Sequence, residues 1–299
     1  MQKQVERLKR QDAIFWTVGL CSLLLALVTL VSLIVDMAMT GWPRISPEFF
    51  MSFASRFPEK AGILSAWVGS LTVVLVTSFL AIPLGVATGV YLEEYAGKNL
   101  LTKIIEINIL NLAGIPSITY GLMALGFFVY SLHFGQSILT AGLTLGLLVL
   151  PIIIVTTREA IRTIPSHIRE ASYALGSTKW QTVWNHIIPY SSGGILTGVV
   201  IALSRAIGET APLLTVGALT FIAFLPTAPV MTTPPYVSAQ FLMDPYTVMP
   251  IQMFSWVSRP QEEFHVNAAA AGIVLLSMTL LLNAAAIYIR FRFRRKYKW

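Results

Sequence analysis

Charged residues are scarce in this chain. Only 12% of its 299 residues are Asp, Glu, Lys or Arg, about half the share usual for a soluble domain, while 55% are hydrophobic and the mean hydropathy is +0.70. Five long stretches contain almost no charge: 13–35, 61–92, 107–157, 181–243 and 266–289. About 20 apolar residues cross about 30 Å of hydrocarbon as a helix. The composition therefore excludes a soluble globular domain and predicts a multi-pass membrane protein.

Cysteine is almost absent, since Cys21 is the only one, and this excludes an internal disulfide and a multi-thiol metal site. The four histidines have neither metal-ligand nor catalytic spacing. We expect no catalytic residues, no metal site and no cofactor. A phosphate-binding loop for ATP is also missing: around Gly97, Leu92 replaces the first glycine and Asn99 replaces Ser or Thr. The chain is therefore not expected to be an enzyme.

The net charge of +7 does not indicate a nucleic-acid partner, because the basic residues flank apolar runs and leave no basic soluble domain. For six spans, 16 lysines and arginines fall on the side of the two termini and 4 on the opposite side. Cytoplasmic loops carry the excess of Lys and Arg, so both termini are expected in the cytoplasm. The basic start, Lys3 to Arg10, precedes an apolar run too long for a signal peptide, which predicts a retained first span.

The apolar runs predict an all-α transmembrane bundle of about six spans, surrounded by membrane lipid. Helices are expected because every backbone polar group must be satisfied inside the bilayer, and the alternating pattern of an outer-membrane barrel is missing. The whole chain, 1–299, is expected to form one domain with its core at about 66–289. The predicted spans are 13–36, 66–91, 107–131, 138–157, 191–223 and 267–289. The fifth is too long for one crossing, so 212–223 is either transmembrane or re-entrant.

The segment 158–190 between the fourth and fifth spans has the pattern of two short helices. Pro165 suits a helix start, Gly176 suits the left-handed residue that ends a helix, and Thr178 with Gln181 matches a capping box. Ile168, Ser172 and Leu175 are expected to share one helix face. From this pattern alone, a surface hairpin without a partner and a docking element for a partner are equally good interpretations.

Two ionisable residues, Arg205 and Glu209, lie inside the fifth apolar run. Their i,i+4 spacing places both side chains on one helix face, and charge inside the membrane is costly unless it faces protein or water. One interpretation is an ion pair that braces the bundle. The other is an anion site, because the planar fork of arginine matches phosphate-type oxygens and Glu209 would hold that fork while the site is empty.

Part of the loop resembles a known sequence motif. Glu170-Ala171-Ser172, followed by Gly176 and by 186–189, is similar to the EAA loop of binding-protein-dependent ABC importer permeases. Ser172, His186 and Ile188 depart from the usual residues. The resemblance implies a type I ABC importer permease fold and a separate ATPase dimer, with Glu170, Ala171 and Gly176 as the residues that couple the two.

A more specific resemblance involves the run 204–213, which reads Ser-Arg-Ala-Ile-Gly-Glu-Thr-Ala-Pro-Leu, together with 82–85, 91–95 and 114–121. These segments resemble phosphate permeases of the PstA type over most of 66–223. The resemblance implies import of inorganic phosphate across the bacterial inner membrane by alternating access, with Arg205 and Glu209 in the substrate pathway. It also implies a PstC-type permease partner and a periplasmic or extracellular phosphate-binding protein. The alternatives are another oxyanion such as molybdate or sulfate, an anion channel or secondary transporter, and a non-transporting scaffold.

Overall fold

The computed structural model describes residues 2–97, 99–228 and 238–296, and within these ranges it is helical, without strands. The α-helices are α1 (Gln2–Gly41), α2 (Pro47–Met51), α3 (Leu64–Val90), α4 (Leu100–Ala113), α5 (Ser117–Ala124), α6 (Ile138–Arg162), α7 (Ser166–Ala174), α8 (Lys179–Thr182), α9 (Ile188–Gly208), α10 (Ala211–Val216), α11 (Met249–Val257) and α12 (Glu262–Lys296). Short 3-10 helices are η1 (Trp42–Arg44), η2 (Pro58–Lys60) and η6 (Gln240–Met243), and π-helical turns are η3 (Tyr91–Tyr95), η4 (Leu125–Ser131) and η5 (Val183–Ile187).

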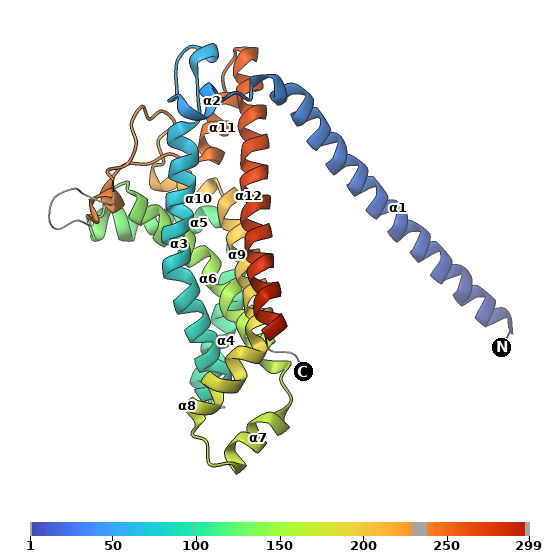
Figure 1. Ribbon diagram of the computed structural model, residues 1–299. Coiled ribbons are helices and arrows are strands. Elements are labelled where there is room, and N and C mark those ends of the chain that lie inside the picture. The colour runs from blue at the N-terminus through green and yellow to red at the C-terminus, as the bar shows by residue number, and fades with distance from the viewer. Residues whose placement is uncertain (1, 98, 229–237, 297–299) are drawn as a thin grey trace.

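Helix α6 is the centre of the bundle, with α3 packed on one side and α9 on another, while α12 packs along α9 (Figure 1). Glycines make these approaches close, because a side chain at Gly85 of α3 would collide with Ile153, and one at Gly198 of α9 would collide with Thr156. Small residues at these positions therefore serve close helix packing. The opposite ends of the bundle are called here the α2 end and the α7 end (Figure 1).

Among the described residues, five helical segments are long and apolar enough to cross a membrane, or six if the bent α4–α5 pair is one span. They are 8–44, 64–95, 138–162, 179–208 and 262–292. The predicted third span, 107–131, is wrong as a single helix. It is divided between α4 and α5 with η4, two pieces that meet at 106°. Gly114 ends α4, and Pro116, which has no N–H, starts the new direction.

The predicted fifth span is also interrupted. Helix α9 ends at Gly208, and the chain then forms the six-residue α10, which ends at Gly217 with a left-handed backbone (φ 98°). Helix α10 crosses α5 so closely that a side chain at Gly121 would collide with Pro212 and Thr215. Residues 212–223 are therefore not a continuation of the span: α10 packs on α5, and the segment after it runs along α3, where the carbonyl of Ile222 accepts from Ser65.

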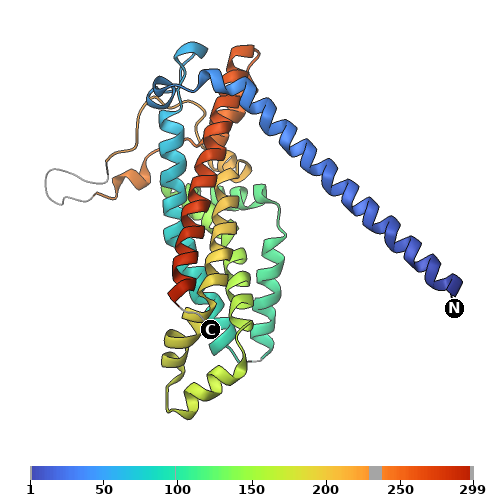
Figure 2. The same ribbon diagram turned by 45° about the vertical axis from the view of Figure 1, so that its right-hand side comes forward.

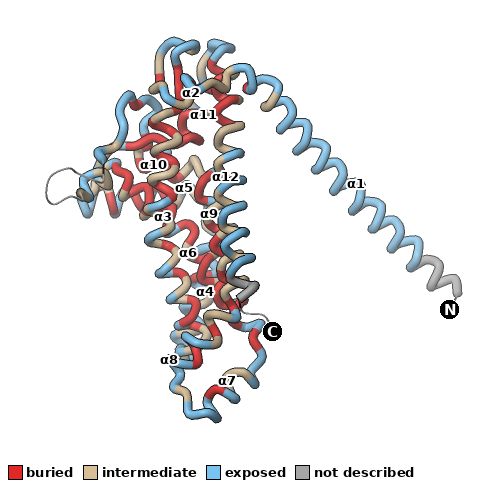
Figure 3. The backbone as a smooth tube through the Cα atoms, in the orientation of Figure 1, coloured by how far each residue is buried: buried red, intermediate tan, exposed pale blue. Residues whose placement is uncertain are grey.

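Helix α1 leaves the bundle (Figures 1 and 2). Its apolar stretch is exposed along its whole length, and only its last turns contact α12, where Gly41 lies against Ala269 and Ala270 (Figure 3). At the α2 end, Arg44 ties the following segment down by donating to Asn267 Oδ1 at 2.8 Å and to the carbonyl of Glu59 at 2.6 Å. The first predicted span is thus a helix whose apolar surface is not covered by this chain.

Candidate functional site

The loop 158–190 has the local structure that its sequence predicted. Helix α7 follows Pro165, Gly176 adopts a left-handed backbone with φ of 83°, and the capping box of Thr178 and Gln181 starts α8. Hydroxyls of Ser172 and Thr182 lie 2.9 Å apart and join α7 to α8. The loop is therefore an ordered helical hairpin that extends beyond the ends of the membrane-length helices (Figure 3).

The surface of α7 is largely exposed. Glu170, Ala171 and Gly176, the residues that the EAA resemblance singled out, all face solvent. The prediction for Leu175 is wrong: it does not share the buried face with Ser172 but follows the last turn of α7, and its side chain is 88% exposed. The helix ends one residue before Leu175, because the chain turns toward the left-handed Gly176. The result is an exposed apolar side chain beside the exposed Glu170.

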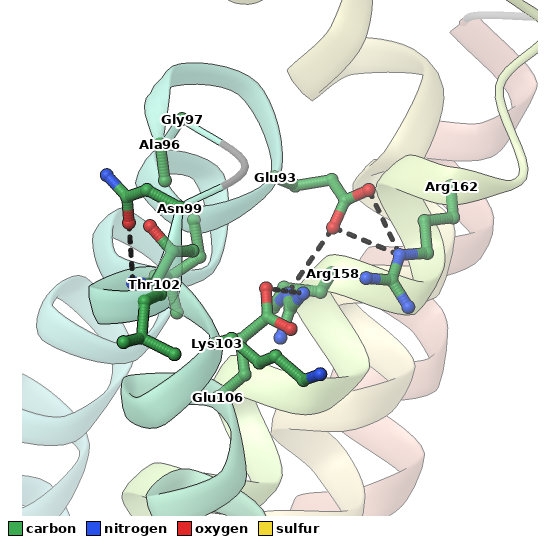
Figure 4. Close-up of a pocket in the computed structure, with 11 residues that line it drawn as sticks. Glu93, Ala96, Gly97, Asn99, Thr102, Lys103, Glu106, Arg158 and Arg162 are labelled. Atoms are coloured by element: carbon green, nitrogen blue, oxygen red, sulfur yellow. Dashed lines mark hydrogen bonds and ion pairs between the residues drawn. The ribbon is translucent and has the colours of Figure 1, made fainter.

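A cluster of charged side chains lies where α3, α4 and α6 meet near the α7 end (Figure 4). Arg158 of α6 donates to Glu93 at 3.3 Å and to Glu106 of α4 at 2.6 Å. Arg162, one turn later, donates through Nε to both oxygens of Glu93 at 3.0 Å. These residues line a cavity of about 610 Å³ between η3, the start of α4 and the end of α6. The cluster thus joins three helical segments through ion pairs.

Arg169 extends the same arrangement to α7. Its guanidinium donates to Glu94 Oε1 at 3.0 Å from Nε and at 2.6 Å from Nη2. Its other contacts are the carbonyl of Ile164, at 3.0 Å, and that of Ile161 at the end of α6, at 3.4 Å. The Glu94 side chain is only 6% exposed. One arginine therefore holds α7, η3 and the end of α6 together.

The sequence reasoning missed this cluster, because it counted Arg158, Arg162 and Arg169 only as markers of membrane orientation. A usable signal was present. Glu93 and Glu94 directly follow an apolar run of 32 residues, and the three arginines follow the next uncharged run, 107–157. Carboxylates placed at a membrane boundary need cationic partners, and the predicted topology places these arginines at the same boundary.

Arg205 and Glu209 are brought together, as the sequence predicted. Arg205 Nε donates to Glu209 Oε1 at 3.1 Å, with side chains 43% and 17% exposed. The expected common helix face is wrong in one respect, because α9 ends at Gly208 and Glu209 already has an extended backbone (φ −75°, ψ 126°). Glu209 thus reaches back to the last turn of the helix. Among the described residues, it is the one recorded ion-pair partner of Arg205.

The surroundings of Arg205 fix the orientation of its helix. The neighbouring Ser204 donates to Asn283 Oδ1 of α12 at 2.6 Å. On the other side, α10 starts two residues after Glu209 and packs against α5. Arg205 therefore lies between the braced α9–α12 contact and the α5–α10 crossing. Its guanidinium is partly exposed and donates through Nε to Glu209.

A polytopic helical bundle with a charged pair inside a span is typical of membrane transport proteins. The family model described as "Binding-protein-dependent transport system inner membrane component" matches residues 81–298. The chain belongs to this family. That result confirms the family membership that the EAA-like loop indicated, and the expectation that the chain is a permease subunit and not itself an enzyme.

The most similar relatives include permeases named for phosphate transport. The phosphate transport system permease protein PstA of Haemophilus influenzae is 31% identical over 95% of this chain and 89% of its own length. PstA 1 of Mycobacterium tuberculosis H37Rv is 28% identical over 95% and 89%. The probable ABC transporter permease protein YqgI of Bacillus subtilis is 35% identical over 68% of each chain.

Solved ABC transporters share the fold at low sequence identity. A chain of the MetNI methionine ABC transporter in an inward-facing conformation has a TM-score of 0.59 and 18% identity, covering 75% of this chain and 93% of that chain. A chain of a bacterial alginate ABC transporter, bound to its periplasmic protein, has a TM-score of 0.66 and 14% identity over 95% and 96%. These likenesses confirm the predicted type I ABC importer permease fold.

Proposed function

We propose that this chain is one membrane subunit of an ATP-driven importer of inorganic phosphate. The observation that carries the choice of cargo is the similarity, over 95% of the chain, to permeases named for phosphate transport. The partly exposed guanidinium of Arg205 supports it, because a planar fork of N–H donors binds phosphate oxygens in pairs.

Coupling to ATP is assigned to α7. In this proposal the α7 end faces the cytoplasm, where Glu170, Ala171 and Gly176 dock on a separate ATPase subunit, with the exposed Leu175 as an apolar contact. ATP binding closes the ATPase dimer and moves α7, and the attached helices alternate between outward-open and inward-open states. The short turn at Gly176 keeps the hairpin compact, so that it moves as a rigid piece.

Arg205 and Glu209 form the phosphate contact of this subunit. While the site is empty, Glu209 holds the guanidinium; when phosphate arrives, the anion replaces this carboxylate as the partner of Arg205. The repulsion between phosphate and Glu209 keeps the contact transient, as passage requires. The uncovered face beside Arg205 is completed by a PstC-type permease, which together with this chain forms a heterodimer in the bacterial inner membrane.

The decisive experiment measures phosphate uptake into vesicles that hold the co-expressed complex, with ATP inside and a phosphate-binding protein outside. Uptake that needs both ATP and the binding protein supports the proposal. Uptake of molybdate or sulfate in preference to phosphate would reassign the cargo. Uptake driven by an ion gradient without ATP, or a complex that never retains an ATPase, would replace the importer with a channel or secondary transporter.

A further inference from the structure

The charged cluster connects the hairpin helix α7 to helices of the bundle through a series of ion pairs. Glu93 and Glu94 are neighbours in the π-helical turn η3, which directly continues α3, yet their carboxylates serve different helices. Glu94 accepts from Arg169 of α7, and Glu93 accepts from Arg158 and Arg162 of α6. The turn η3 therefore contacts α7 through the carboxylate of Glu94 and α6 through that of Glu93.

The next contact leads to α4. Arg158 is 91% buried as a side chain and bridges Glu93 to Glu106, so that η3, α6 and α4 are joined by one guanidinium. Helix α4 has few other attachments: Ile109 is its one buried residue, packed with Leu92 and Ile154. Because most of α4 is exposed, the Arg158–Glu106 ion pair is a main tie between this helix and the bundle.

Helix α4 continues through the 106° bend into α5, and α5 crosses α10 at Gly121. Helix α10 starts two residues after Glu209, the partner of Arg205. A continuous series of contacts thus runs from α7 through η3, α6, α4 and α5 to the segment that carries the anion site. Packed elements with discrete arrangements are what transmits motion between distant sites.

The contacts of α7 determine which neighbouring segments move when α7 moves. Toward α8 it is held by the Ser172–Thr182 hydroxyl contact. Its Ile168 also packs against an apolar cluster that includes Val90 of α3 and Ile161 of α6. Toward η3 it is held by Arg169, whose carboxylate partner Glu94 is 6% exposed. A partly buried, charge-assisted contact is shorter and stronger than a neutral hydrogen bond, so it keeps its geometry under load. Within the described residues, this is the charged contact that joins α7 to a segment outside the loop.

We propose that Arg169 and Glu94 are a positioning pair that passes the movement of the coupling helix α7 to α3 and, through Glu93, Arg158 and Glu106, to α4. Neither residue touches phosphate or ATP in this assignment. The inference rests on the proposed function, because it needs a complex that moves phosphate at the expense of ATP. Its consequence is specific: without the pair, α7 still docks on the ATPase and hydrolysis continues, but less of the movement reaches the anion site.

The test uses the full complex, with its ATPase and permease partners, reconstituted in vesicles with ATP inside and a phosphate-binding protein outside. Arg169→Gln and Glu94→Gln are compared with Glu159→Gln, which removes an ion pair of the same cluster from a carboxylate that is 64% exposed. The three measurements are retention of the ATPase subunit, ATP hydrolysis and phosphate taken up per ATP hydrolysed. A purely stabilising pair would not change the third.

For Arg169→Gln and Glu94→Gln we expect retained ATPase subunits and near-normal hydrolysis, while phosphate taken up per ATP falls about tenfold, within the range that path mutations produce. Glu159→Gln keeps the wild-type ratio. The double variant is no worse than either single variant, because both remove the same link. Arg169→Lys, which keeps the charge without the fork, recovers part of the ratio and serves if Arg169→Gln does not assemble.

The inference is overturned if both glutamine variants keep the wild-type ratio, or if uptake in every variant falls only in proportion to lost ATPase subunit. A double variant whose loss is the product of the two single losses also contradicts a shared link. These outcomes differ from failure of the proposed function, in which the wild-type and Glu159→Gln complexes themselves take up no phosphate.

Discussion

Arg205→Ala is expected to remove most phosphate uptake while the complex remains assembled. The Arg205–Glu209 pair is partly exposed, with the arginine side chain 43% accessible, so solvent screening limits its contribution to stability. Exposed pairs contribute at most about 1 kcal/mol, and losing that leaves a well-packed bundle folded. The Ser204–Asn283 hydrogen bond, which joins α9 to α12, is unaffected by the change.

The expected loss in uptake follows from the contacts of the guanidinium. Two charge-assisted hydrogen bonds from the fork to phosphate contribute about 1.5 kcal/mol each at the low end of their range. Together that is about 3 kcal/mol, or uptake slower by a factor of about 100 at subsaturating phosphate. Arg205→Lys, which keeps the charge but presents no planar fork, should lose about tenfold.

The assay measures initial uptake of labelled phosphate into vesicles loaded with ATP, and affinity purification measures subunit retention. Ser204→Ala is the matched control, because it alters the adjacent residue of α9 and removes a neutral hydrogen bond, with an expected cost near 0.6 kcal/mol. Normal uptake by Arg205→Ala would assign the pair to bracing the bundle. Loss of assembly without a specific loss of uptake would do the same.

The coupling surface and the α5–α10 crossing give two further predictions. Glu170→Lys reverses a charge on the exposed face of α7 and is expected to loosen the ATPase subunit in affinity purification, whereas unchanged retention and transport would contradict the docking assignment. Gly121→Ala places a methyl group against Pro212 and Thr215, and overpacking of this kind costs about 1–3 kcal/mol, so the Tm of the purified complex should fall. Gly126→Ala, at a position with open space, is its control and should leave the Tm unchanged; equal Tm values for both would show that the crossing is not tightly packed.

Local sequence patterns were sufficient for the loop that couples this subunit. The signals in this loop affect only the backbone within a few residues of each. Helix α7 starts after Pro165, Gly176 adopts the left-handed conformation, and Thr178 with Gln181 caps α8, as expected. Four of the six spans were predictable for a similar reason, because a long run without charge indicates a membrane crossing, whereas the third and fifth are interrupted. The exception was Leu175, whose burial depended on where the helix ended and not on its spacing alone.

The effect of each proline was not predictable from its neighbours. Pro83 and Pro151 lie inside α3 and α6, which continue past them, whereas the chain bends by 106° next to Pro116. Adjacent helices support the two central prolines, since α3 and α6 pack against each other. Pro116 follows Gly114 at the edge of the bundle, where α4 has little packing to hold it straight. Tertiary support therefore decides between a tolerated proline and a break.

Long-range ion pairs were invisible for a different reason. Arg169 and Glu94 are 75 residues apart, and Arg158 and Glu106 are 52 residues apart, so no spacing rule connects them. They meet only because the ends of α3 and α6 lie beside the first half of α4 (Figure 4). The sequence could indicate that carboxylates and arginines collect at one membrane boundary, but the fold decides which of them meet.

The interruption of the fifth span determines the electrostatic surroundings of Arg205. Because α9 ends at Gly208, Arg205 lies in the last turn of that helix, where unpaired carbonyls carry a partial negative charge that favours a nearby cation. The same interruption places Glu209 outside the helix, and its carboxylate reaches back to accept from Arg205 Nε at 3.1 Å. An unbroken span would have placed both residues on a continuous helix and removed the free helix end. The interruption that the sequence left undecided therefore determines both the helix end and the carboxylate that surround this arginine.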